Sequence, residues 1–253
     1  MEEPISTASS QKRRLKGGTG QRQKPERSIA DLRASGRLNK AESLIKQTLR
    51  ANPNDATALH QSGLIAQNKG KTGRAVQLLQ RAAAAQPDAA DICCDLGLAL
   101  KALGRFDEAV EAQKNVTDLL PTSARAWSNY GTALISAKRT EDAIAAFIQA
   151  VALDSHDPEL YYNLGNALLA SDDPVTAEGA FLRALKIQPN HIGALTNLGS
   201  ALKDQGRMDE AEAILRGTAI LDPDNADLKW NLAIVLLTAG RFREGWAAYE
   251  ARR

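Results

Sequence analysis

The sequence has few of the residues that usually form reactive or cross-linked sites. Among 253 residues there are three histidines, and the only two cysteines, Cys93 and Cys94, are adjacent. Adjacent cysteines cannot build a disulfide framework, and they lack the spaced partners that a structural zinc site requires. The sequence signatures of phosphate loops, zinc proteases, serine nucleophiles and dinucleotide sites are also absent. We therefore expect no catalytic residues, no metal, no cofactor and no enzymatic activity.

Long apolar runs are missing as well. No stretch approaches the roughly 18 to 20 apolar residues that span a bilayer, and the first thirty residues lack the apolar block of a secretory signal. We expect a cytoplasmic protein without a membrane span. Three tryptophans, four tyrosines and four phenylalanines offer little bulky material for one large core. An alanine-rich composition of this kind favours helices.

Charge is distributed unevenly along the chain. Residues 1–27 carry seven basic and three acidic side chains, whereas residues 28–253 carry 25 basic and 27 acidic ones. The first segment has almost nothing to bury, which predicts a disordered basic tail. Lys12, Arg13 and Arg14 could attract nucleic acid, but we favour a solvated tail and do not expect nucleic acid to be the partner.

The chain repeats itself every 34 residues. If the most regular glycine is taken as position 8 of each unit, position 20 is alanine, position 32 is usually proline and position 15 is often a second glycine. The position-8 glycines are Gly63, Gly97, Gly131, Gly165 and Gly199, followed by Ala233. The position-20 alanines are Ala41, Ala75, Ala109, Ala143, Ala177 and Ala211, before Gly245 ends the series.

Each unit predicts two packed helices joined by a turn. In the unit 90–123, apolar residues at helical spacing indicate a first helix over 90–103, which Gly104 ends. A second helix then begins near Asp107 and stops before Pro121. Because the residues at positions 8 and 20 are small, we expect the two backbones to approach closely there.

These residues resemble the tetratricopeptide repeat. The resemblance rests on the run Trp127 to Leu134 (WSNYGTAL), on the run Tyr161 to Leu168 (YYNLGNAL) and on Phe147 and Phe181 at position 24. It implies an all-α, right-handed superhelical α-solenoid of helix-turn-helix units over 28–253. We expect full repeats at 56–89, 90–123, 124–157, 158–191 and 192–225, a degenerate repeat at 28–55 and an incomplete one at 226–253.

Two departures from the pattern are informative. Lys138 and Asp172 replace the turn glycine, so we expect less regular turns there. The last unit lacks a polar capping helix and leaves an apolar flank near Trp246 and Tyr249. Another domain or another chain would cover this flank, unless the final helix frays. Self-association through the flank is one such outcome.

Position 6 of the first helices predicts a binding surface. It reads Gln61, Asp95, Asn129, Asn163, Asn197 and Asn231 in consecutive units. A carboxamide both donates and accepts hydrogen bonds, so a row of asparagines suits an extended peptide of almost any sequence. An alternative is that these amides only join adjacent helices or bind water. The predicted partner-binding residues are Asn129, Asn163, Asn197, Asn231, Asn166, Arg125, Tyr162 and Trp230.

These features lead to two functional readings. The first is a protein-protein interaction scaffold that binds an extended peptide or protein segment in its concave groove. The second follows from resemblance: the asparagine row is similar to the repeats of O-linked N-acetylglucosamine transferases, and the segment 240–252 resembles the last repeat of bacterial tetratricopeptide-glycosyltransferase proteins. It implies the substrate-presenting arm of an enzyme whose catalytic domain lies outside these 253 residues.

A histidine and a cysteine in neighbouring units could suggest a reactive pair. His60 and Cys94 both occupy position 5 of neighbouring units and could face each other as a base and a thiol. We expect instead a polar residue lining the groove beside a small, mostly buried thiol.

Overall fold

The computed structural model describes residues 28–251 as fourteen α-helices without a β-strand, which confirms the all-α solenoid. The predicted tail over residues 1–27 lies outside the described residues. No helix between residues 28 and 251 has both the length and the apolar character that a bilayer crossing requires. The helices are α1 (Ile29–Ala34), α2 (Leu38–Ala51), α3 (Ala56–Asn68), α4 (Thr72–Ala85), α5 (Ala90–Ala102), α6 (Phe106–Leu119), α7 (Ala124–Ser136), α8 (Thr140–Leu153), α9 (Pro158–Ala170), α10 (Pro174–Ile187), α11 (Ile192–Asp204), α12 (Met208–Leu221), α13 (Ala226–Thr238) and α14 (Phe242–Glu250).

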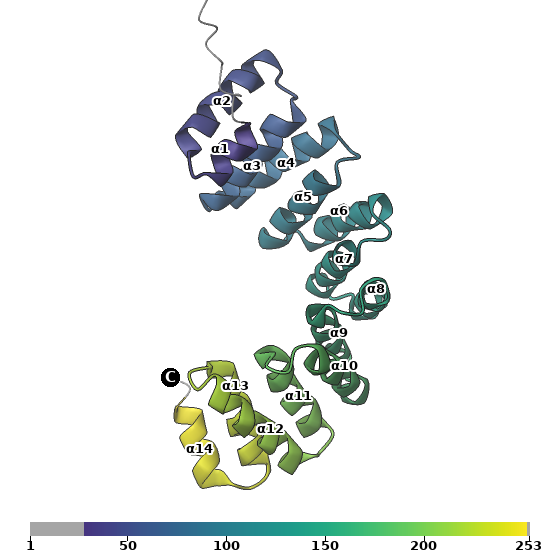
Figure 1. Cartoon of the computed structure of the whole chain (residues 1–253), viewed down its shortest axis with the longest axis vertical. Helices are drawn as coiled ribbons and strands as arrows, with labels where there is room; N and C mark the ends of the chain where they lie inside the picture. Colours follow the sequence, from purple (N-terminus) through teal and green to yellow (C-terminus); the bar gives the residue numbers. More distant parts are fainter. Residues whose placement is uncertain (1–27, 252–253) are drawn as a thin grey trace, which may run out of the picture.

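The helices form pairs that stack into a curved rod (Figure 1). From α3 onward, each odd-numbered helix begins 34 residues after the previous one. Every odd-numbered helix has Cα atoms within 8 Å of the next odd-numbered helix, whereas within residues 28–251 no two even-numbered helices approach each other so closely. The odd-numbered helices are therefore closer together and line the inner, concave side of the rod (Figure 1).

Small residues set the distance between the two helices of each pair. A Cβ atom built on Gly63 would lie 2.8 Å from Cγ of Leu79, and one built on Gly131 would lie 2.8 Å from Cε1 of Phe147. Both distances are shorter than carbon atoms tolerate, so a larger residue at either position would have to displace the opposing side chain. All six alanines at position 20 are fully buried. The predicted close approach at positions 8 and 20 is confirmed.

The turns at Lys138 and Asp172 are as regular as the glycine turns. Their φ angles are 60° and 62°, close to the 79° of Gly104. The N–H of Arg139 donates to the carbonyl of Leu134 at 2.9 Å, as the N–H of Arg105 donates to the carbonyl of Leu100 at 3.0 Å. The expectation of irregular turns was wrong, because packing of the two helices fixes the turn and forces a non-glycine residue into the left-handed region.

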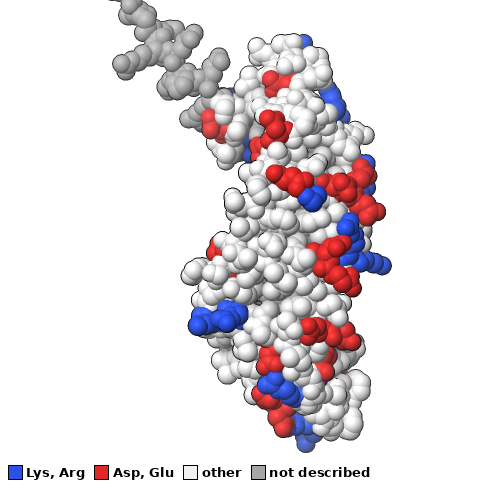
Figure 2. All heavy atoms as spheres, turned by 90° about the vertical axis from the view of Figure 1, so that its right-hand side faces the viewer, with Lys and Arg blue, Asp and Glu red and all other residues white. Residues whose placement is uncertain are grey.

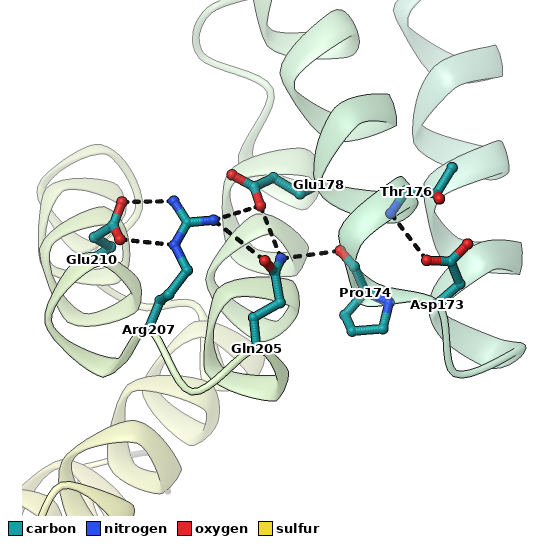
Figure 3. A network of polar contacts seen from close by, with 7 residues as sticks. All are labelled: Asp173, Pro174, Thr176, Glu178, Gln205, Arg207 and Glu210. Atoms are coloured by element: carbon teal, nitrogen blue, oxygen red, sulfur yellow. Dashed lines mark hydrogen bonds and ion pairs between the residues drawn. The ribbon is translucent and has the colours of Figure 1, made fainter.

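A polar network joins the unit 158–191 to the unit 192–225 (Figure 3). Arg207, which precedes α12, donates two hydrogen bonds of 2.8 and 2.7 Å to Glu210. The same guanidinium donates to Glu178 of α10 at 2.6 Å. Gln205 donates to Glu178 at 2.8 Å and to the carbonyl of Pro174 at 3.2 Å. The network therefore connects the turn of one unit to the second helix of the unit before it.

The network also changes the acidity of its members. The hydrogen bond from Gln205, followed by the one from Arg207, lowers the pKa of Glu178. The hydrogen bond from Arg207 lowers the pKa of Glu210. Hydrogen bonds that are donated to a carboxylate are stronger than those to the protonated acid, so they favour the ionised form of both groups. The network is thus a contact of the ionised carboxylates.

Charged side chains on the side of the rod seen in Figure 2 gather along one edge, where both signs lie next to each other. Ion pairs of this mixed kind recur at the beginning of the even-numbered helices. They include Arg105 with Glu108 at 2.5 Å, Arg139 with Asp142 at 2.7 Å and Arg207 with Glu210 at 2.7 Å. Because positive and negative side chains alternate along this edge, it does not form the continuous basic surface that binds the phosphates of nucleic acids.

The last helix pair carries exposed aromatic side chains. Phe242 and Trp246 of α14 are 63% and 55% exposed. The ring of Trp246 packs edge-on against Tyr249, with centroids 5.6 Å apart. The apolar flank predicted from the sequence is therefore present on the described residues, and self-association through it stays a prediction.

Candidate functional site

The asparagine row lies on four consecutive inner helices, α7, α9, α11 and α13. Asn129, Asn163, Asn197 and Asn231 are each half-buried. Each occupies the same place on its helix, and the four helices lie on the concave side of the rod (Figure 1). The four side chains are neither fully exposed nor sealed between the helices.

Three of these amides already bond to the preceding unit. Nδ2 of Asn129 donates to Sγ of Cys94 at 3.4 Å, and Nδ2 of Asn163 donates to Oγ of Ser128 at 3.5 Å. Nδ2 of Asn197 makes the shortest bond, to Oδ1 of Asn166 at 2.6 Å. These three N–H groups therefore join adjacent helices, as the alternative interpretation of the row expected. A carboxamide keeps a second N–H and an acceptor oxygen, which remain for a ligand.

The two earlier members of the row have other partners. Oε1 of Gln61 accepts a hydrogen bond of 2.8 Å from Nε of Arg33. Asp95 lies 2.7 Å from Nε2 of His60, which is itself buried. The asparagine row consequently begins at α7 and continues to α13.

Within residues 28–251, residues of the inner helices line two hollows of about 290 Å³ each, among others. The Cys94 pocket lies between α5 and α7 and is lined by Cys94, Asp95, Arg125 and Asn129, among others. The Tyr162 pocket lies across α9, α11 and α13. Its lining includes Tyr162, Thr196, Asn197, Asp227, Trp230 and Asn231.

Six of the eight residues predicted to bind a partner line one of these hollows. Arg125 and Asn129 line the Cys94 pocket, and the Tyr162 pocket has Tyr162, Asn197, Trp230 and Asn231. Asn163 and Asn166 lie on α9 outside both linings. Asn166 contributes by accepting the bond from Asn197. The residues thus form one surface with two depressions.

The histidine and cysteine at position 5 do not form a reactive pair. His60 bonds to Asp95, whereas Cys94 accepts a hydrogen bond from Asn129. Burial, followed by the nearby carboxylate of Asp95, raises the pKa of the Cys94 thiol. A thiol that is harder to ionise is a weaker nucleophile at neutral pH. Within residues 28–251 there is also no group of three or more histidine, cysteine, aspartate or glutamate side chains placed to hold a metal ion.

His191 supports the site, although it was not among the residues predicted to bind a partner. Its Nδ1 accepts a hydrogen bond of 3.2 Å from the N–H of Ala194 and so caps α11. Its Nε2 lies 3.1 Å from a carboxylate oxygen of Glu159. The ring centroid is 4.9 Å from that of Tyr162. The only signal in the sequence is its place at the end of a unit, where capping residues recur.

Sequence profiles of known families match most of the described chain. Profiles described as "Tetratricopeptide repeat" match residues 31–90, 66–128, 168–220 and 202–245, and one described as "TPR repeat" matches residues 131–172. The chain belongs to the tetratricopeptide-repeat family. No curated protein matches the chain.

Solved structures with this fold cover much of the tetratricopeptide rod. The MamA protein is 26% identical, with a TM-score of 0.60 over 65% of this chain and 90% of that one. PilF of Pseudomonas aeruginosa is 23% identical, with a TM-score of 0.62 over 77% of this chain and 88% of that one. YrrB, described as "a TPR protein with an unusual peptide-binding site", is 19% identical, with a TM-score of 0.54 over 69% of this chain and 90% of that one.

Proposed function

We propose that this tetratricopeptide-repeat protein is an interaction scaffold that binds an extended peptide or protein segment along its concave wall. The observation that carries the proposal is the alignment of the amide row with the two hollows on consecutive inner helices. Amide oxygens and N–H groups accept and donate to a peptide backbone, and the hollows take side chains.

The spacing of the units suits an extended chain. Neighbouring helices pack about 8–10 Å apart, while an extended peptide advances about 3.3 Å per residue. About every third residue of the peptide would then meet an amide. Because the bonds go to the peptide backbone, they place little restriction on its sequence. YrrB has the same fold and is described as having a peptide-binding site, which supports this reading.

The proposal is tested by binding to a library of blocked dodecapeptides. We expect the double variant Asn163→Ala, Asn197→Ala to bind selected peptides about tenfold more weakly than the unmodified chain, which corresponds to about 1.4 kcal/mol. Gln149 and Arg183 are exposed residues on α8 and α10, and their double alanine variant is the matched control.

Both variants should be compared by titration calorimetry after circular dichroism has shown that they fold. Asn163 and Asn197 also join adjacent units, so their thermal stability must be measured alongside their affinity. Equal binding by the asparagine variant and the control, or no binding by the unmodified chain to any peptide, would contradict the proposal.

A second candidate is the substrate-presenting arm of a glycosyltransferase. It is motivated by the asparagine row and by the segment 240–252. It predicts that the chain forms a complex with a glycosyltransferase domain and increases sugar transfer to protein substrates. Co-purification of the chain with no glycosyltransferase, together with an unchanged transfer rate, would count against it.

A further inference from the structure

The Tyr162 pocket has an unusual arrangement of side chains at one repeat position. Tyr162, Thr196 and Trp230 occupy position 5 of three consecutive units. A small threonine therefore lies between two large aromatic side chains, and all three line the same hollow. The arrangement makes a slot with aromatic walls and a threonine between them.

Neighbouring side chains hold the aromatic walls in place. The ring of Tyr162 packs against His191 at 4.9 Å and against Phe181 at 6.3 Å. Gly193 makes room for it, because a Cβ atom there would lie 3.1 Å from Oη of Tyr162. Trp230 is 41% exposed, and its ring packs against Tyr249 at 5.6 Å. Walls that are already ordered lose little entropy when a ligand enters.

The polar groups of the slot favour a positive ligand. Asp227 is the one charged residue of its lining, and within residues 28–251 it forms no ion pair. Thr196 is 6% exposed, and its Oγ1 has no hydrogen-bond partner among the described residues. Glu159 adds a second carboxylate beside the Tyr162 wall, through its contact with His191. The slot thus combines aromatic side chains with the carboxylate of Asp227 and the unpartnered hydroxyl of Thr196.

The Cys94 pocket differs in this respect. Arg125 lines it together with Asp91 and Asp95, so its lining carries both signs of charge. A basic side chain there would have to compete with Arg125 for the two carboxylates, whereas Asp227 has no basic residue beside it in its lining. Selection by charge is therefore expected at the Tyr162 pocket.

We infer that the Tyr162 pocket selects a basic side chain of the bound peptide. The aliphatic stem of an arginine or lysine lies between the faces of Tyr162 and Trp230, and its charged end reaches Asp227. Arginine binds better than lysine, because a planar guanidinium stacks on aromatic rings and can make two hydrogen bonds to a carboxylate. This inference rests on the proposed binding of an extended peptide and assigns one anchor to it.

The test uses the full chain and a library of acetylated, amidated dodecapeptides that are randomised at their central positions. Peptides bound by the unmodified chain should be enriched in arginine, and less so in lysine, at one position. The enrichment should disappear in Asp227→Asn and return in Asp227→Glu. Asp209→Asn is the matched control, because Asp209 is a 93%-exposed carboxylate on α12 outside the pocket.

One selected peptide is then compared with a copy in which citrulline replaces its arginine. Citrulline keeps the shape but has no charge. The exchange should weaken binding to the unmodified chain and to Asp209→Asn about tenfold, and binding to Asp227→Asn less than about twofold.

The outcomes separate this inference from the proposed function. Peptides that bind without a basic preference, or an equal citrulline penalty in Asp227→Asn, would overturn the assignment of the pocket and leave the scaffold function intact. Failure of every peptide to bind the unmodified chain would overturn both.

Discussion

Phe181 occupies the space that a side chain at position 165 would need. A Cβ atom on Gly165 would lie 2.5 Å from Cε1 of Phe181, which is fully buried. The contact joins α9 to α10 and recurs at the same two positions of the other units, for example between Gly199 and Leu215. It determines how closely each inner helix lies to its outer partner.

We predict opposite effects of two glycine substitutions in this unit. Gly165→Ala should lower the free energy of unfolding by about 1–3 kcal/mol, because Phe181 has to move. Gly179→Ala should raise it by about 0.5–1 kcal/mol, because Gly179 is an exposed residue within α10 with nothing within 4 Å of its added Cβ. Urea unfolding followed by circular dichroism measures both. A stabilising Gly165→Ala would show that the close approach is absent.

Glycine should stabilise the two turns that lack it. Lys138 and Asp172 adopt φ angles of 60° and 62°, which strain a residue with a side chain. Lys138→Gly and Asp172→Gly should each raise the free energy of unfolding by about 0.5–1 kcal/mol, after the larger entropy of the unfolded glycine chain is taken into account.

The matched control for these turns is Gly104→Lys. Gly104 has a φ angle of 79° and nothing near its added Cβ, so only backbone strain acts on the variant. It should lose about 1–2 kcal/mol. If Lys138→Gly and Gly104→Lys both left the urea midpoint unchanged, the left-handed turns would carry no strain.

The network around Arg207 should make stability depend on pH. Hydrogen bonds from Gln205 and Arg207 lower the pKa of Glu178 in the folded chain. A lowered pKa contributes stability above the unfolded value of about 4.3, and this contribution is lost as the pH falls through the folded value. The unmodified chain should therefore be more stable than Glu178→Gln at neutral pH, and the difference should shrink toward zero near pH 3.

The measurement for this prediction is the urea midpoint of both proteins across that pH range. Glu141→Gln offers a comparison, because Glu141 is an exposed carboxylate at the beginning of α8. A constant difference between Glu178→Gln and the unmodified chain at every pH would mean that the ionised network does not stabilise the fold.

The two cysteines should react slowly in the folded chain. Burial raises the pKa of Cys93 and of Cys94, and Cys93 is 5% exposed. Alkylation by iodoacetamide at neutral pH should be slower than in the urea-unfolded chain by about tenfold or more, because little thiolate is present and access is restricted. Mass spectrometry of the modified peptides measures the rate. Rapid alkylation of Cys94 in the folded state would contradict this prediction and would show that its thiol is reactive.

Much of the fold could be predicted from the sequence because it repeats. A column such as that of Gly131 reports a close contact with the side chain at position 24, which recurs in successive units although the residue at position 24 varies, and Ala143 stands for a column that is fully buried. The turns at Lys138 and Asp172 could not be inferred in the same way. A residue type reports only local preference, whereas the stacked helices impose the turn on it.

Less of the candidate site than of the fold could be predicted from the sequence. Position 6 predicted the row and left open whether its amides join adjacent helices, but it did not predict which atoms of the preceding unit Asn129, Asn163 and Asn197 bond. Two acceptors, Cys94 and Ser128, share position 5 but differ in residue type, and the third, Asn166, lies at position 9, so no single column reveals all three bonds. The Tyr162 pocket likewise depends on Asp227 and on the ring of His191, which only the stacking of three units brings together.

The central claim is that the partner lies on the inner wall. It is tested by placing a photoreactive amino acid at Thr132 on α7 or at Ile148 on α8. Thr132 lies three residues after Asn129 on the same inner helix. Ile148 is 50% exposed and lies on the outer helix of the same unit. Irradiation with a bound peptide should cross-link it to position 132 and leave position 148 unmodified. Cross-linking at position 148, without any at position 132, would contradict the account.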